Sequence, residues 1–206
     1  DGRQVAMSAA GDIAIVRAAL DEAAGALDAL RGNAAVLGAV ARAGELLAAT
    51  FAARGKAISC GNGGSMCDAM HFAEELSGRF RDDRPAYAAV AISDVTHLTC
   101  VGNDYGFDRV FARYVEAHGN AGDVLVGIST SGTSRNVVAA AEAARALGVR
   151  VIALTGKEGS PLEALADVAI VTAGGRYADR VQELHIKVIH ILIELVERHL
   201  AAPAAR

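Results

Sequence analysis

Residues 124–147, VLVGISTSGTSRNVVAAAEAARAL, join a short apolar run, a loop of small hydroxyl residues and an alanine-rich segment. The apolar run at 124–128 has the length of a buried strand, and the apolar spacing at 135–147 predicts a helix. A strand that passes through a small-residue loop into a helix is the building unit of parallel α/β sheets. This stretch therefore predicts the fold class.

The same alternation continues on both sides of this stretch. Further strands are expected at 56–60, 87–92, 149–154 and 168–171. Helices are expected near 66–78, at 95–117 with a break around 102–106, after Pro161 and at 179–200. The prediction is a three-layer α/β/α domain with a five-stranded parallel sheet of flavodoxin-like type.

Residues 12–53 precede the sheet and carry apolar residues at intervals of three and four, which predicts two helices. Arg31-Gly32-Asn33 marks the break between them, so we expect an N-terminal helical hairpin. No repeat or linker divides the chain. We therefore expect a single domain over 1–206, in which the hairpin is followed by the α/β core and the last helix at 55–200. Residues before about 13 are interpreted as an extension.

The apolar surfaces of the helices indicate self-association. The hairpin must bury its apolar stripe, and the last helix is apolar almost all round between residues 188 and 196. Closed symmetric assemblies are the commonest solution for such surfaces, and we expect a homotetramer built as a dimer of dimers. The alternative is a central helix that is buried within one chain.

The composition excludes several classes of protein. Of the 206 residues, 52% are hydrophobic and 21% are charged, which excludes a disordered chain. The net charge of −4 provides no basic field for nucleic acid or an anionic membrane. The most apolar stretch, 188–196, is far shorter than the ~20 residues of a membrane span. Three irregularly spaced cysteines do not make a disulfide framework, so we expect a soluble, cytoplasmic protein with reduced core cysteines.

Five of the six residues in the loop 129–134 carry hydroxyl groups, namely Ser129, Thr130, Ser131, Thr133 and Ser134. The loop leads into a helix, whose free N–H groups and positive dipole end attract anions. A phosphate monoester fits such a site. The loop has neither a lysine nor Walker spacing, which disfavours a nucleoside triphosphate. The alternative, a helix cap with a polar turn, requires only one or two hydroxyl groups.

The loop Gly61-Asn62-Gly63-Gly64-Ser65 follows the first expected strand. Its glycines allow the backbone to approach a ligand closely and to adopt positive φ. The loop lacks the GxGxxG spacing, which disfavours a dinucleotide. The alternative is a tight connection without a ligand.

Polar residues on two helices complete the candidate site. His71 and Glu75 are four residues apart and project from one helix face. His190 lies inside the apolar run of the last helix, where a buried imidazole needs a partner. Taken alone, the His71 and Glu75 pair is more typical of a surface ion pair, and His190 is more typical of a core histidine. Met70, Phe72 and Leu76 are interpreted as core residues.

The chain also resembles a known family from about Ile13 to His199, namely the bacterial phosphoheptose isomerases of the sugar-isomerase (SIS) fold. Five segments in the same order carry the resemblance: CGNGGSMCDAMHFAEELSGRF (60–80), AISDVTHLTCVGNDYGF (91–107), GDVLVGISTSGTSRNV (122–137), ALTGKEGS (153–160) and YADRVQELHIKVIHILIELVE (177–197). The resemblance implies a cytoplasmic homotetramer that converts sedoheptulose 7-phosphate to D-glycero-D-manno-heptose 7-phosphate. This is the first step of ADP-heptose biosynthesis for the lipopolysaccharide core.

The resemblance also assigns roles to residues. It implies sugar contacts by Asn62, Gly63, Gly64, Asn103 and Asp104, with Ser65 as a secondary substrate-binding candidate, and phosphate contacts by Ser129, Thr130, Ser131 and Ser134. It implies a zinc ion held by His71, Glu75, Gln182 and His190, with Glu75 and Gln182 also facing the substrate. Glu75 and His190 would form the catalytic acid/base pair. Arg79 and Asp179 are secondary candidates.

Four of these residues have structural alternatives. Asn103 could sit in a turn, and Asp104 could cap a segment that starts at Tyr105. Arg79 could pair with a neighbouring aspartate. Asp179 is placed well for the N-cap of the last helix.

The chemistry of the implied reaction matches these side chains. Conversion of a ketose to an aldose needs removal of a proton beside the carbonyl, a cis-enediol intermediate and return of the proton to the neighbouring carbon. Glu75 is assigned this role. His190, with an intrinsic pKa near 6.5, would move a proton between O1 and O2. Zinc would polarise the carbonyl as a Lewis acid.

The implied ligand set has a geometric difficulty. Gln182 and His190 are about 12 Å apart along a straight helix and turned by about 80°. Either the first turn of the helix is distorted or a neighbouring chain supplies one of the groups. We expect the second arrangement, because a shared site would also explain the oligomer.

Two rival functions remain on sequence grounds. One is a non-catalytic SIS protein that binds a phosphosugar or a partner protein such as the replication initiator DnaA. Such relatives lose the acid/base residues, whereas this chain retains Glu75 and His190. The other is an isomerase or sensor for a different sugar phosphate, since a hydroxyl-rich loop reports phosphate but not chain length.

Overall fold

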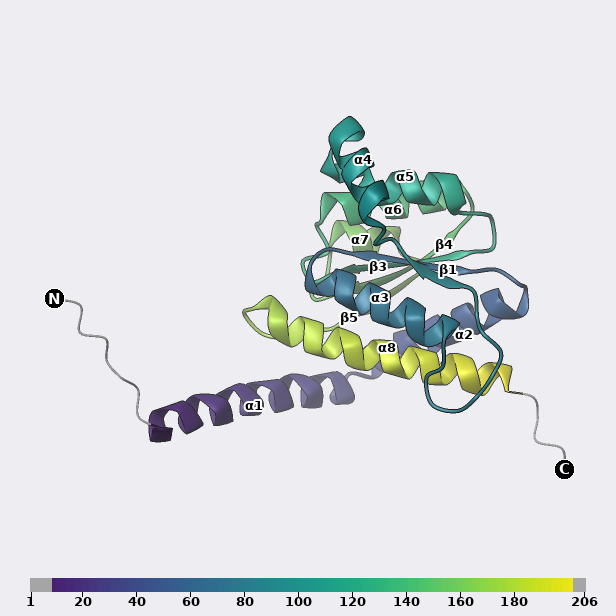
Figure 1. Ribbon diagram of the computed structural model, residues 1–206. Coiled ribbons are helices and arrows are strands. Elements are labelled where there is room, and N and C mark those ends of the chain that lie inside the picture. Colours follow the sequence, from purple (N-terminus) through teal and green to yellow (C-terminus); the bar gives the residue numbers. More distant parts are fainter. Residues whose placement is uncertain (1–8, 202–206) are drawn as a thin grey trace, which may run out of the picture.

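The computed structural model describes residues 9–201 and has a five-stranded parallel sheet at its centre (Figure 1). The strand order is β2-β1-β3-β4-β5. The strands are β1 (Ala57–Gly61), β2 (Ala89–Ala91), β3 (Val124–Ser129), β4 (Arg150–Thr155) and β5 (Val168–Val171). All four pairings are parallel, and the expected five-stranded parallel sheet is confirmed.

Helices cover both faces of the sheet (Figure 1). One face carries α2 (Ala34–Ala52), α3 (Gly64–Ser77) and α8 (Ala178–Leu200). The other carries α4 (Val95–Tyr105), the 3-10 turn η1 (Phe107–Arg109), α5 (Val110–His118), α6 (Arg135–Ala146) and α7 (Pro161–Leu165). The domain therefore has the expected three layers.

The side chains of each strand divide between two cores. Val124, Val126 and Ile128 of β3 face the core beneath α2, α3 and α8, whereas Leu125 faces the other core. This is the period of two that a strand imposes. Because helices bury both faces, the strand is apolar throughout and shows no polar alternation.

The N-terminal helices form, but not as a hairpin. The helix α1 (Ala9–Gly32) is separated from α2 by Asn33 alone. Figure 1 shows that α1 leads away from the domain, while α2 packs beside α8. The expected hairpin is wrong for this chain, because one residue outside helical geometry bends the path without reversing it. Asn33 instead caps α2 by accepting a hydrogen bond from the N–H of Val36 at 3.2 Å.

The strand β2 is shorter than the predicted 87–92. Its expected first residue, Tyr87, donates its N–H to the carbonyl of Leu76 at 3.0 Å instead of to a neighbouring strand. The ring of Tyr87 stacks on Phe51 of α2, with 5.2 Å between the ring centroids. The residue therefore anchors the end of α3. The break between α4 and the following turn lies at Gly106, whose φ of 86° suits glycine.

Two expectations about burial are wrong. Met70 is 47% exposed, although Phe72 and Leu76 are buried as predicted. Cys67 and Cys100 are exposed, and only Cys60 is a core cysteine. Burial raises the pKa of the Cys60 thiol to about 12, so this thiol stays protonated and unreactive.

One helix of the described residues, α2, is long and apolar enough to cross a membrane by length and composition alone. About half of the apolar window is buried inside the protein, including Ala43 and Leu47. A core helix passes the same test, and α2 packs as one, against α8 and the sheet.

Candidate active site

The loops after β1 and β3 lie side by side at the carboxyl edge of the sheet. Gly61 at the end of β1 pairs with Ile128 near the end of β3. The strand order reverses between these two strands, because β2 lies on one side of β1 and β3 on the other. Ligands of open parallel sheets bind at such a switch point. Both loops singled out from the sequence therefore meet where a ligand is expected.

The loop at 129–134, called the hydroxyl loop, is held in shape by hydrogen bonds that its own side chains make. Ser129 Oγ donates to Ser134 Oγ at 3.0 Å, and the N–H of Gly132 donates to Ser129 Oγ at 3.2 Å. Ser131 Oγ accepts from the N–H and the hydroxyl of Thr133 at 3.2 and 3.0 Å. Ser134 occupies the N-cap position of α6, but its side chain makes no capping hydrogen bond. Capping alone thus does not explain these hydroxyl groups.

Gly132 brings the hydroxyl loop against the next loop along the sheet. Its φ is +66°, and a Cβ atom there would lie 2.2 Å from Ser160 Oγ and 2.7 Å from Thr155 Oγ1. Thr130 adds a backbone contact, because its carbonyl accepts from the N–H of Gly156 at 3.0 Å. Only glycine fits this position.

Asn62 is tied to Asn136, a residue that the sequence reasoning missed. Each side-chain amide donates to the other at 2.8 Å, and Asn136 is buried in the first turn of α6. The pair joins the loop at 61–65, called the glycine loop, to α6, the helix that follows the hydroxyl loop. Its position as a polar residue just before the apolar run of α6 was the one feature of the sequence that pointed to Asn136. The Asn62 side chain is therefore engaged within the protein, and its carbonyl accepts from the N–H of Ser65 at 3.0 Å.

Gln182 lies beside the start of α3. The N-cap residue Gly63 has a φ of 55°, and a Cβ atom at Gly64 would lie 2.7 Å from Gln182 Nε2. Gly64 precedes His71 by two helical turns, about 10 Å along α3. In this chain Gln182 therefore sits near the glycine loop, apart from His190, as the spacing along α8 predicts.

Three side chains from two helices meet farther along α3 and α8. His71 Nε2 lies 3.0 Å from His190 Nε2 and 3.3 Å from Glu75 Oε1. The nearest ligand atoms of all three residues lie within 4.8 Å of one another. Each residue is partly buried, so the group is accessible yet shielded. The structure thus brings together the proposed catalytic pair and one further candidate ligand.

The surroundings of His190 favour its neutral form. Burial is the largest cause that lowers the pKa of His190, and the adjacent His71 lowers it further. Glu75 acts in the opposite direction. The ring of Phe80 packs 5.6 Å from that of His190. A neutral imidazole can accept a proton or bind a metal ion.

The donor set fits a divalent transition metal. Ligand atoms around a tetrahedral zinc ion at ~2.1 Å are separated by about 3.4 Å. This is close to the 3.0 Å between His71 and His190 and the 3.3 Å between His71 and Glu75. Two imidazole nitrogens and a carboxylate oxygen are ligands that zinc accepts, and catalytic zinc sites keep a fourth position open. His71, Glu75 and His190 can therefore hold a metal ion without rearrangement of the backbone.

Asp68 is a further polar residue that the sequence reasoning did not single out. It precedes His71 by one turn of α3, and its Oδ2 is buried without a hydrogen-bond partner among the described residues. Burial raises the pKa of this carboxyl to about 6, whereas the nearby His71 lowers it.

The remaining candidates lie elsewhere. Asn103 and Asp104 are exposed in the last turn of α4, across the sheet from α3, where Asn103 Nδ2 donates to Asp104 Oδ1 at 2.7 Å. Neither the turn nor the cap considered for them is found. Arg79 and Asp179 are exposed, and the N-cap of α8 is Tyr177 instead of Asp179. Ser65 is buried in the first turn of α3.

Known proteins are similar to this chain in both sequence and fold. A family model described as SIS domain matches residues 21–156. The phosphoheptose isomerase of Aeromonas salmonicida is 59% identical over 187 residues, covering 91% of this chain and 97% of that protein. That of Edwardsiella ictaluri is 57% identical over 188 residues, with the same coverage.

Solved structures agree. A phosphoheptose isomerase from Francisella tularensis superposes with a TM-score of 0.85 at 33% identity, covering 93% of this chain and 100% of that chain. The phosphoheptose isomerase from Neisseria gonorrhoeae gives a TM-score of 0.82 at 41% identity, covering 89% and 97%. The chain belongs to the phosphoheptose isomerase family of SIS-domain proteins.

Proposed function

We propose that this protein is an aldose-ketose isomerase that converts sedoheptulose 7-phosphate to D-glycero-D-manno-heptose 7-phosphate. The observation that carries the proposal is the convergence of His71, Glu75 and His190 within 4.8 Å on two neighbouring helices. The relatives of this chain are named for the same class of reaction. A non-catalytic role is not favoured, because the acid/base side chains are present and adjacent.

The hydroxyl loop at 129–134 binds the phosphate in this proposal. Its hydroxyl groups and the N-terminus of α6 supply donors without a cation. The glycine loop is tied to α6 by the pair Asn62 and Asn136, which supports binding of one elongated ligand by both loops. Main-chain groups at Gly63 and Gly64 would face the sugar, with Ser65 behind them.

Glu75 performs the proton transfers at carbon. Its carboxylate removes a proton from C1 of the ketose, and the electrons of that bond form the C1–C2 double bond as O2 becomes the anionic oxygen of a cis-enediolate. His190 takes the proton from O1 and delivers it to O2, since its lowered pKa keeps the imidazole neutral and able to accept it. The same carboxyl group of Glu75 then returns its proton to C2, while the electrons on O1 form the aldehyde C=O bond.

His71, Glu75 and His190 would hold a zinc ion with Gln182 as a further ligand, and the substrate carbonyl would take a fifth position. Zinc bound there supplies Lewis-acid polarisation of the substrate carbonyl. Tight coordination would lower the basicity of Glu75, so we expect the carboxylate to be held loosely. Because Gln182 lies near Gly64, we expect the Gln182 that completes the set to come from a neighbouring chain. Asn103 and Asp104, exposed on α4, would also act across a subunit boundary.

Such sharing requires an oligomer, and we propose a homotetramer. Support comes from α1, whose apolar side chains Ile13, Val16 and Leu20 are more than half exposed in the single chain. We also infer one domain over residues 1–206, because α8 packs against α2 and the sheet. The reaction would take place in the cytoplasm, as the first step of ADP-heptose synthesis for the lipopolysaccharide core.

The test is conversion of sedoheptulose 7-phosphate by the purified protein, followed by NMR with and without added zinc. Formation of the aldose is expected. A hexulose 6-phosphate serves as the comparison substrate and should turn over far more slowly. Failure to convert the heptulose under both conditions would contradict the proposal, and faster conversion of the hexulose would reassign the substrate.

A further inference from the structure

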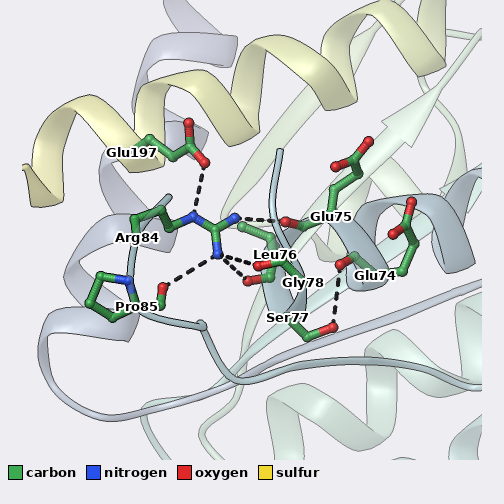
Figure 2. Close-up of polar contacts among 8 residues, drawn as sticks. All are labelled: Glu74, Glu75, Leu76, Ser77, Gly78, Arg84, Pro85 and Glu197. Atoms are coloured by element: carbon green, nitrogen blue, oxygen red, sulfur yellow. Dashed lines mark hydrogen bonds and ion pairs between the residues drawn. The ribbon is translucent and has the colours of Figure 1, made fainter. Parts of the chain in front are cut away.

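Arg84 lies between α3 and β2 and connects the end of α3 to α8 (Figure 2). Its side chain is only 11% exposed. The Nε atom donates to Glu197 Oε1 at 2.9 Å, and the Nη2 atom donates to the carbonyl of Glu75 at 2.6 Å. The Nη1 atom donates at 2.8, 3.1 and 3.3 Å to the carbonyls of Leu76, Gly78 and Pro85. Every nitrogen of the guanidinium group is therefore engaged.

The carbonyls that Arg84 binds belong to the end of α3. The last carbonyls of a helix have no partner within the helix and must find donors elsewhere. Arg84 supplies donors to Glu75 and Leu76 and places a positive charge at the negative end of the helix dipole. The backbone position of Glu75, the proposed base, thus depends directly on this guanidinium group.

A second contact holds the guanidinium group in place. Its carbon lies 4.6 Å from the centroid of the Tyr87 ring. That ring stacks on Phe51 of α2, and the N–H of Tyr87 binds the same Leu76 carbonyl as Arg84. The plane of the group is thus supported by an aromatic ring that is itself packed against the core.

The other end of the connection reaches the helix that carries His190. Glu197 follows His190 by seven residues, which is two helical turns and places both on one face of α8, about 10 Å apart. One edge of the guanidinium group therefore binds the turn of α3 that bears Glu75, and another binds the face of α8 that bears His190.

We propose that Arg84 is a positioning residue that sets the register of α3 against α8 and, with it, the placement of Glu75 and His71 relative to His190. Its catalytic consequence rests on the proposed function. A lysine at this position would keep the charge but lose the planar fork that reaches both helices at once.

Arg81, from the same segment, provides a contrast. It pairs with Glu194 of α8 at 2.9 Å, but its side chain is 59% exposed, and it contacts the ring of Phe80 instead of the end of α3. An exposed pair of this kind contributes little. The buried connection through Arg84 is therefore the one expected to hold the two helices.

The kinetic test compares Arg84→Gln, Arg84→Lys and Glu197→Gln with the control Arg145→Gln. Arg145 also donates to a helix-end carbonyl, that of Leu165 in α7, on the opposite face of the sheet. For zinc-saturated Arg84→Gln we expect kcat for sedoheptulose 7-phosphate to fall by about 10-fold to 100-fold, because small displacements of catalytic groups are costly. KM should stay within about twofold of the wild-type value, since the substitution leaves the hydroxyl loop unchanged.

The lysine variant should lose less activity than the glutamine variant, because it retains one donor for Glu197. Glu197→Gln keeps every contact of Arg84 with the carbonyls and should lower kcat by about threefold, as a small change of helix position would. The Arg145→Gln control should leave kcat unchanged.

A second measurement does not depend on turnover. In metal-free protein, the ring NMR resonances of His71 and His190 should shift in Arg84→Gln and in Glu197→Gln, whereas those of His118 in α5 should not. If the wild type failed to convert the heptulose phosphate, the proposed function would fail while this spectrum still tested the positioning role.

Several results would overturn the inference. These are a folded Arg84→Gln variant with unchanged kcat and unchanged histidine resonances, an equal loss of kcat in Arg145→Gln, or a rise of KM alone. If circular dichroism shows that Arg84→Gln does not fold, Glu197→Gln decides: unchanged kcat and resonances in that variant would reject the role of Arg84.

Discussion

The Nε2 atoms of His71 and His190 lie 3.0 Å apart, although 119 residues separate them in the chain. Both α3 and α8 begin at the carboxyl edge of the sheet, after β1 and β5. They cover the same face, and Figure 1 shows them side by side. Helices that start at the same edge bring residues at similar depth together, which pairs Gly64 with Gln182 and His71 with His190.

Glu75→Gln should abolish exchange of the C1 proton of the substrate with solvent, because an amide cannot accept that proton. Phosphate binding should persist, since the hydroxyl loop is unchanged. NMR in deuterated water measures the exchange, and calorimetry measures binding. Exchange at the wild-type rate in this variant would remove Glu75 as the base.

His71→Gln should weaken zinc binding by at least about 10-fold to 100-fold, the loss that even an outer-shell partner causes, because a direct donor group is removed. His118→Gln is the control, since His118 packs on Tyr114 across the sheet. Competition with a chromogenic chelator gives the affinities. Chelation of zinc from the wild type should likewise lower turnover, and zinc should restore it. Equal zinc affinity in the two variants would argue against a metal site at His71.

Gly132→Ala should raise KM by about tenfold, because the added Cβ would lie 2.2 Å from Ser160 Oγ and displace the hydroxyl loop, where the phosphate is proposed to bind. Gly159→Ala is a matched control. Its φ of +68° imposes a similar backbone cost, about 1 kcal/mol, but a Cβ there meets nothing within 4 Å. Steady-state kinetics and thermal unfolding separate the two effects. A similar KM for both variants would indicate that the contact with Ser160 does not shape the loop.

His185 should make the free energy of unfolding depend on pH. It is fully buried on α8, and neither ring nitrogen has a hydrogen-bond partner among the described residues. Burial lowers the pKa of His185 to about 4, although the nearby Thr155 main chain acts in the opposite direction. As the pH falls below 6.5, His185 becomes protonated in the unfolded chain, whereas in the folded protein it is protonated only near pH 4. The free energy of unfolding therefore declines across this range.

At about 1.4 kcal/mol for each pH unit, this loss amounts to about 3 kcal/mol. Urea unfolding at several pH values between 7 and 4 measures it. His185→Leu should flatten the dependence, while the same change at the exposed His199 should not. An unchanged slope in His185→Leu would exclude His185 as its source.

Local patterns predicted the strands and most helices, because each depends on the spacing of apolar residues within one segment. The errors have local causes as well. Tyr87 is an aromatic residue of the kind favoured in strands, but its N–H donates to the carbonyl of Leu76 at the end of α3. Met70 is apolar yet lies on the exposed face of α3. The hairpin expectation failed because the sequence does not reveal how far a single residue, Asn33, turns the chain.

The candidate site was only partly predictable. The hydroxyl loop is contiguous in sequence and could be recognised from composition. His190 and His185 look alike as histidines in an apolar helix, and only packing distinguishes them: His185 is fully buried without a partner, while His190 meets His71. Asn136 and Arg84 belong to no recognisable sequence motif. Their hydrogen-bond partners, Asn62 and Glu197, lie 74 and 113 residues away in the chain.

The sequence by itself determined the parallel α/β architecture, the hydroxyl loop and the family, because these depend on short-range periodicity and contiguous motifs. The tertiary structure alone decided which histidine joins Glu75, where Gln182 lies, and how Arg84 connects two helices. Those relationships arise when helices distant in the chain pack on one face of the sheet. Their distances follow from packing and hydrogen bonding across elements, which no local pattern encodes.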